Sequence, residues 1–197
     1  MNTTTGYQLK KGTNAAGNYL YLEVDDGGGE GVETYNFGSG SALAVNTWYR
    51  IVVVADRDIA PNLYINGEFI SAPTTSTDGN TWSSISSDSL DSTADLYVGA
   101  YAHDQSLLWF GMIADVQLYK KAWTASDVTY DWENPDKDVF DGSNNILPTD
   151  CTALYRLNEG AGDRVYNAAP VLSANLVTNG DFSAMTNSVP DGFTAND

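Results

Sequence analysis

Residues 63–70 read Leu-Tyr-Ile-Asn-Gly-Glu-Phe-Ile, and this stretch predicts a β-hairpin. Its central pair, Asn66-Gly67, supplies the two positive-φ positions that a type I′ turn requires, and short apolar runs flank the pair on both sides. Further segments have the period-two alternation or the β-branched content of strands: 19–24, 48–55, 96–101 and 108–120. Antiparallel strands that bury one face produce this pattern.

One short segment is typical of a helix. Thr124 can cap its first turn through the side-chain hydroxyl, and Asp127, three residues later, favours the positive end of the helix dipole. Pro135 follows shortly after the expected end. Many short strands and a single helix predict an all-β fold, a two-sheet antiparallel jelly-roll sandwich with one short helix.

The composition limits the partners that the chain can have. Against 26 Asp and Glu residues stand only 9 Lys and Arg, which gives a formal charge of -17 over 197 residues. Nucleic acid is not expected as a partner, because phosphate binding needs clustered cations. No stretch reaches the roughly 20 apolar residues that span a bilayer, so membrane insertion is not expected either. Cys151 is the one cysteine and has no partner for an internal disulfide.

Several motifs carry a resemblance to a known family: Thr47 to Val52, Leu63 to Gly67, Leu96 to Gly99, Phe110 to Tyr119 and Lys121 to Val128. In this order they resemble the laminin-G-like branch of the concanavalin A-like jelly rolls. The resemblance implies two curved sheets and a calcium ion at a loop rim, which is frequent but not universal. It also implies binding of sugars or proteins rather than chemistry.

The chain departs from the family at both ends. The family's opening strand is missing near the N-terminus, and a similar segment stands late in the chain, at 154–166. A return of this segment to the same sandwich is favoured, because a missing strand would leave an unpaired apolar edge. We therefore expect a laminin-G-like jelly roll over residues 1–172, with its last strand supplied by 152–168. Residues 173–197 are expected to be a linker or the start of a second module, since 175–182 resembles the first strand of a carbohydrate-binding jelly roll.

Catalysis is not expected. Glycoside hydrolases with related sandwiches carry an E-x-D-x-x-E strand that sets two carboxylates across the sugar bond, and Glu23-Val24-Asp25 begins in this way. Glycine stands at position 28, where the second glutamate should be, and interrupts the strand. His103 and Cys151 have no partner groups at a spacing that suits a nucleophilic triad. The expectation is a protein that is not an enzyme.

Clustered acidic residues make calcium a candidate cofactor. The first choice is the group Asp25, Asp26 and Glu30, because oxygen ligands suit Ca²⁺ and the ion relieves their mutual repulsion. No EF-hand spacing is present, so the ligands would have to converge from different loops. The alternative is a solvated acidic surface that only aids solubility.

Aromatic residues on the outer side of predicted strands, and others in or beside loops, are the candidate ligand contacts, because flat rings suit the apolar faces of sugars. The candidates are Tyr64, Trp82, Tyr97, Tyr101, His103 and Trp109. Tyrosine is also common on any half-exposed strand face, so each tyrosine has a purely structural alternative. Trp82 lies in the long polar stretch 71–92, where its indole either contacts a ligand or folds back to cover the sandwich.

These observations predict a non-catalytic module that binds a glycan or a neighbouring protein on an extracellular or virion-surface assembly, of the phage fibre or capsid decoration type. The virion setting comes from the family resemblance alone. The charge favours a neutral or basic partner, whereas an acidic polysaccharide would need bridging calcium. One alternative is a purely structural protein that packs against copies of itself in a homo-oligomer, and a glycoside hydrolase ranks behind both.

Overall fold

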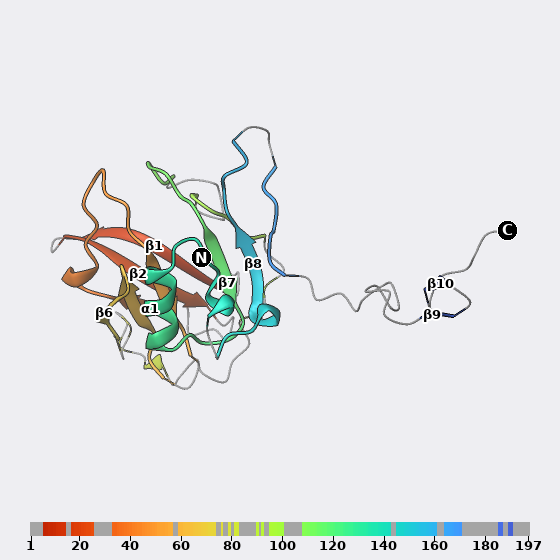
Figure 1. Ribbon diagram of the computed structural model, residues 1–197. Coiled ribbons are helices and arrows are strands. Elements are labelled where there is room, and N and C mark those ends of the chain that lie inside the picture. The colour runs from red at the N-terminus through yellow and green to blue at the C-terminus, as the bar shows by residue number, and fades with distance from the viewer. Residues whose placement is uncertain are drawn as a thin grey trace.

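The computed structural model describes a body of strands and one α-helix (Figure 1). The described residues are 6–14, 17–25, 33–56, 59–73, 76, 79, 81–82, 90, 92, 95–100, 108–142, 145–160, 164–170, 185–186 and 189–190.

The first sheet contains three antiparallel strands in the order β1-β2-β3: β1 (Gly6–Asn14), β2 (Gly17–Asp25) and β3 (Glu33–Asn36). Only β2 is predicted from the sequence. Leu20, Leu22 and Val24 share the face that lies in the main core, while Tyr19 and Tyr21 on the other face are buried as well.

The hairpin predicted at 63–70 is confirmed. β5 (Asn62–Ile65) and β6 (Glu68–Ser71) pair across Asn66 and Gly67, which have φ angles of 53° and 81°. β4 (Ile51–Val54) pairs with the other edge of β5, which gives the order β4-β5-β6. β4 begins later than the sequence predicts, because the Arg50 N–H donates to the Asn66 side-chain oxygen at 2.9 Å rather than to a strand carbonyl.

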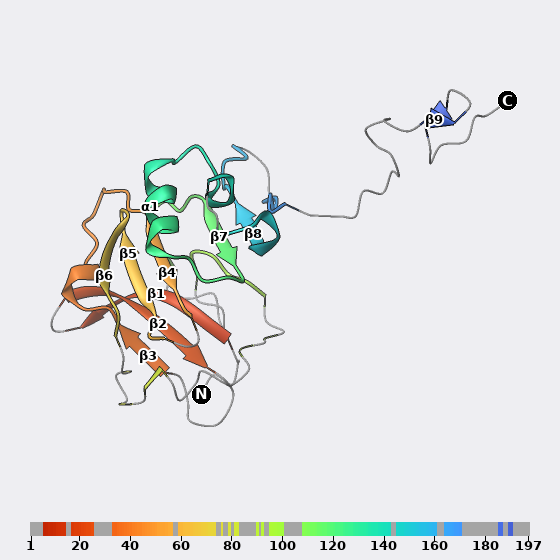
Figure 2. The ribbon, with the colours of Figure 1, turned by 60° about the horizontal axis from the view of Figure 1, so that its bottom comes forward.

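These two sheets pack against each other and enclose the main core. Figure 2 shows the β4–β5–β6 sheet lying across the β1–β2–β3 sheet. The buried apolar side chains of this core come from both sheets and from two segments outside them, which contribute Phe37 and Trp82: Leu20, Leu22, Val24, Tyr35, Phe37, Leu63, Ile65 and Trp82. Burial of this apolar surface is the main stabilising term of the fold.

A third pair of strands comes from the second half of the chain. β7 (Val116–Tyr119) pairs antiparallel with β8 (Cys151–Tyr155). β8 lies at the start of the late segment and pairs with an earlier strand, but the two form a sheet of their own, so the completion of the sandwich by residues 152–168 stays a prediction. The remaining small sheet joins β9 (Met185–Thr186) to β10 (Val189–Pro190).

Two predicted strands are absent or shortened. Residues 96–100 form no strand, and of the predicted run 108–120 only β7 is formed. Gly99 has a φ of 80° and Asp115 a φ of 53°. These left-handed conformations interrupt the extended backbone that a strand needs.

The predicted helix is confirmed as α1 (Ala125–Glu133), and its cap has the expected chemistry. The Thr124 hydroxyl accepts from the Asp127 N–H at 3.3 Å, and Asp127 Oδ2 accepts from the Thr124 N–H at 2.7 Å. Val128 on its buried face packs against Val54 and Tyr64. Figures 1 and 2 both show α1 between the β4–β5–β6 sheet and the β7–β8 pair. The 3₁₀ turns are η1 (Ser39–Ser41), η3 (Val139–Asp141) and η4 (Pro148–Asp150).

The described structure is thus mostly β with one α-helix, as expected. Its strands form small separate sheets of three, three, two and two strands rather than two long continuous ones. No helix in the described part of the chain is both long enough and apolar enough to cross a membrane.

Candidate functional site

Tyr97 and Trp109 come together because two stretches of backbone lie side by side. The Trp109 N–H donates to the Gly99 carbonyl at 2.8 Å. A Cβ placed on Gly99 would lie 3.9 Å from the Cβ of Trp109, and one placed on Gly111 would lie only 2.8 Å from Trp109 Nε1. The indole therefore rests against the backbone of Gly111, where a larger residue would collide with it.

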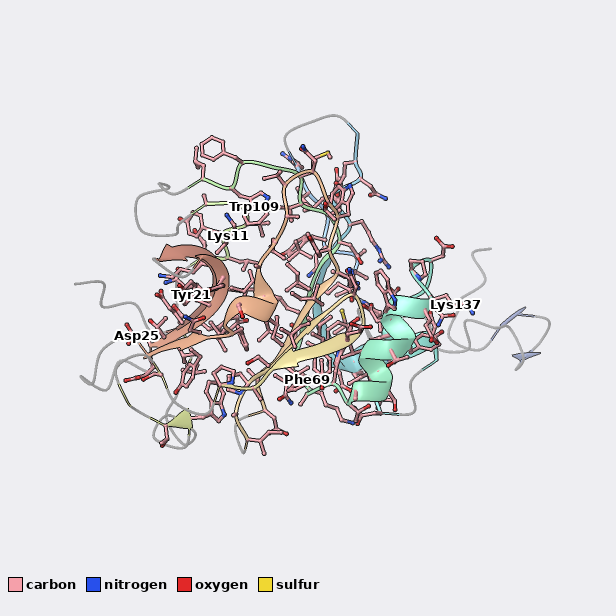
Figure 3. All side chains as sticks on the ribbon, turned by 90° about the vertical axis from the view of Figure 1, so that its left-hand side faces the viewer. Lys11, Tyr21, Asp25, Phe69, Trp109 and Lys137 are labelled. Atoms are coloured by element: carbon pink, nitrogen blue, oxygen red, sulfur yellow. The ribbon has the colours of Figure 1, made fainter. Side chains whose placement is uncertain are left out.

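These two stretches carry a group of large exposed apolar side chains: Leu96, Tyr97, Val98, Leu108, Trp109, Phe110 and Met112. We call this group the Trp109 surface. Phe110 is 96% exposed and Met112 is 73% exposed, so neither contributes to the core. Figure 3 shows Trp109 well separated from α1 and from Lys137. Large exposed apolar groups of this kind are candidates for contact with a partner or ligand.

The structure corrects two of the predicted ligand contacts, Tyr64 and Trp82. Trp82 is 4% exposed, its ring packs edge-on against Tyr35 with centroids 5.1 Å apart, and its Nε1 donates to the Asp56 carbonyl at 2.9 Å. The alternative in which the indole covers the sandwich is therefore the one observed. Tyr64 is buried against Val128, because α1 covers that face of β5. Neither ring is open to a sugar.

Four of the other predicted site residues, Tyr101, His103, Asp26 and Glu30, lie outside the described residues. Asp25 is described and is half-buried at the end of β2, where Figure 3 shows it. Within the described ranges, no three acidic, histidine or cysteine side chains are arranged to hold a metal ion. The calcium site therefore stays a prediction.

A cavity lies beside α1. A cavity of about 270 Å³ is lined by Arg50, Asp115, Asp131, Trp132 and Pro135. Arg50 joins its walls, because Nε and Nη2 donate to Asp131 at 2.6 Å and 2.5 Å while Nη1 donates to Asp115 at 2.5 Å. Bidentate pairing of this kind fixes both position and orientation.

Asp115 is the centre of a wider network. Arg156 donates to Asp115 at 2.8 Å and to Asp138, and Gln117 donates to Asp115 at 2.8 Å. Burial raises the pKa of Asp115, but hydrogen bonding and attraction from Arg50, with help from Gln117 and Arg156, outweigh it and leave that pKa below its usual value. The carboxyl group stays ionised at neutral pH and does not suit a general acid.

Sequence reasoning did not find this cavity. Asp115 and Asp131 lie 65 and 81 positions after Arg50 in the sequence, so only the tertiary structure brings the three residues together. Arg50 and Trp132 stand in ordinary strand and helix patterns, and nothing local distinguishes them. The weak signal was the small number of basic residues, since an arginine within an apolar strand pattern needs a buried acidic partner.

The described structure is a mostly β body with one capped helix and an exposed apolar surface. The family model Laminin_G_3, described as the concanavalin A-like lectin/glucanases superfamily, matches residues 1–129, so the chain belongs to this family. The match confirms the resemblance seen in the motifs, and it gives no support to a carbohydrate-binding-module-like segment after residue 173. No curated protein and no solved structure matches the chain. The superfamily's description names both lectins and glucanases, so membership leaves binding and catalysis open.

Proposed function

We propose that this chain is a non-catalytic binding module that holds a glycan or a neighbouring protein through the Trp109 surface. The observation that carries the proposal is the exposure of seven large apolar residues on two adjacent stretches of backbone. A free chain gains nothing from exposing them, whereas a bound partner removes their area from water. The setting that suits such a module is an extracellular or virion-surface assembly.

The environment of the acidic residues supports binding over cleavage. The Glu23 carboxylate accepts from Gln8 at 2.5 Å and from Thr34 at 3.3 Å, and it also pairs with Lys10. Asp115 is paired with two arginines. A glycosidase places two carboxyl groups across the sugar bond, whereas the carboxylates of Glu23 and Asp115 bond neighbouring side chains of their own chain, which favours a structural role for both.

A glycan array tests this proposal. We expect the purified chain to bind a neutral or basic glycan or protein and the Trp109→Ala variant to lose that binding. Trp48→Ala is the matched control, since Trp48 is also exposed but lies outside the Trp109 surface. Equal binding by the wild type and Trp109→Ala would contradict the proposal.

The second candidate is a structural protein that packs against copies of itself. Its support is the aliphatic share of the same surface, because Leu96, Val98 and Leu108 suit a protein interface better than a sugar. Light scattering distinguishes the two. A homo-oligomer that dissociates in Phe110→Ser favours packing, and a monomer that binds a ligand favours recognition.

A further inference from the structure

We propose that the cavity lined by Arg50, Asp115, Asp131, Trp132 and Pro135 binds a single neutral sugar ring, separately from the Trp109 surface. This inference rests on the proposed function only in taking the chain to be a binding module, and it assigns a site and a ligand class of its own. The argument comes from the size, the walls and the charge of the cavity.

The size suits one small ring. Pockets for drug-sized ligands measure roughly 300–1,000 Å³. The cavity here measures about 270 Å³, which is just below that range. A longer oligosaccharide would extend out of it, so the expected ligand is one sugar residue, either free or at the end of a chain.

The walls combine an apolar face with donors and acceptors. Trp132 is 46% exposed. Its side chain also lies close to the backbone of Gly67, since a Cβ placed on Gly67 would lie 2.8 Å from Trp132 Cγ. The ring is therefore held in place by the β5–β6 turn and still presents area to the cavity. Pro135 adds a second apolar wall. Rigid aromatic area of this kind suits the C–H face of a pyranose.

Arg50 supplies hydrogen bonds to the same space. A guanidinium has more N–H donors than the three that Asp131 and Asp115 use. The carboxylate of Asp115, whose side chain is 26% exposed, also keeps acceptor capacity at Oδ1, because a carboxylate oxygen carries two lone pairs and this one accepts from Arg156. A sugar hydroxyl both donates and accepts, so it can pair with this mixture of groups.

The charge favours a neutral ligand. Two arginines, Arg50 and Arg156, face three aspartates, Asp115, Asp131 and Asp138, which leaves one net negative charge beside the cavity. A carboxylate or sulfate ligand would meet this charge and the acidic surface of the whole chain. A neutral hydroxyl-rich ring is repelled neither by the charge beside the cavity nor by the acidic surface.

The test is an NMR titration of the full chain labelled with ¹⁵N at its tryptophan indoles. The probes are the methyl glycosides of glucose, galactose, mannose and N-acetylglucosamine, with glucuronic acid as the anionic comparison. Of the five tryptophans in the chain, the Trp132 signal is assigned by its absence from Trp132→Ala. We expect a saturable shift of that signal with at least one neutral glycoside and a weaker response to glucuronic acid.

Variants then locate the site. Trp132→Ala should weaken the sugar affinity about tenfold or more, and Trp132→Phe, which keeps a ring, should retain most of it. The matched control Trp48→Ala should bind like the wild type, since Trp48 does not line the cavity. Circular dichroism of each variant checks that the fold is intact.

Several results would overturn the inference: no shift of the Trp132 signal with any neutral glycoside, unchanged affinity in Trp132→Ala, or a preference for glucuronic acid. The outcome is independent of the proposed function. If glycan binding survives in Trp132→Ala and is lost in Trp109→Ala, the cavity assignment fails while the proposed function stands. If the glycosides bind the cavity but Trp109→Ala changes no interaction of the chain, the cavity assignment stands while the proposed role of the Trp109 surface fails.

Discussion

Replacing Arg50 with methionine tests how the strands and α1 are held together. Arg50 makes three hydrogen bonds, and its main partner, Asp131, has a side chain only 2% exposed. Each charge-assisted bond contributes about 1.5–3 kcal/mol, but the contributions are not additive. Removing one member of a buried ion pair costs about 3–5 kcal/mol, because the other charge is left without compensation. We expect Arg50→Met to lower the free energy of unfolding by about 3–5 kcal/mol.

Urea denaturation at neutral pH measures this loss, with an unchanged slope showing that the native surface is the same. Lys11→Met is the control, because it removes a cation from the exposed face of β1 and should stay within about 0.5 kcal/mol of the wild type. Adding Asp131→Leu to Arg50→Met should recover part of the loss, since the buried charge of Asp131 is then removed together with its partner. A loss below about 1 kcal/mol in Arg50→Met, or no recovery in the double variant, would refute the reasoning.

Further predictions concern pH, the hairpin and the core. Because the pKa of Asp115 is lower in the folded chain, its contribution to stability is present above the unfolded value of about 4 and is lost as the pH falls through the folded value. The gap in unfolding free energy between wild type and Asp115→Asn should therefore narrow from about pH 7 to about pH 3, and a constant gap argues against this. Gly67→Ala should cost at least about 1 kcal/mol in thermal unfolding, because φ is 81° and the new Cβ meets Trp132. Trp82→Ala should cost about 3–5 kcal/mol and Trp109→Ala clearly less, because Trp109 is 41% exposed, so similar losses would show that the burial of Trp82 is misassigned.

Local chemistry made part of the fold predictable. The hairpin follows from Asn66-Gly67, because few residue pairs adopt two positive φ angles without strain. The start of α1 follows from Thr124 and Asp127, which satisfy each other's backbone N–H groups. Both signals lie within a few residues, so a sequence pattern records them completely.

Features that depend on distant partners were not predictable in the same way. The run 108–120 has a strand pattern, yet β7 begins only at Val116, because Asp115 has a positive φ. The Asp115 carboxylate pairs with Arg50 and Arg156, which are distant in the sequence. Trp82 stands in a polar loop, but its indole is drawn into the core because Tyr35 and the Asp56 carbonyl satisfy its ring and its N–H.

The candidate site divides along the same line. The exposure of Trp109 agrees with its predicted position beside a loop, whereas Tyr97 was expected on the outer side of a strand and is exposed although residues 96–100 form no strand. The cavity beside α1 needs Arg50, Asp131 and Trp132 to meet, and their meeting is set by how α1 packs on β4 and β5. A pattern of period two or 3.6 contains no information about that packing.

Mass spectrometry of oligosaccharides captured by the immobilised chain tests the central claim most directly, since it reads retention and cleavage in one sample. The account predicts that a retained oligosaccharide is recovered at its original length and that Trp109→Ala no longer captures it. Recovery of shortened oligosaccharides from the wild type, with cleavage abolished by Glu23→Gln, would contradict it.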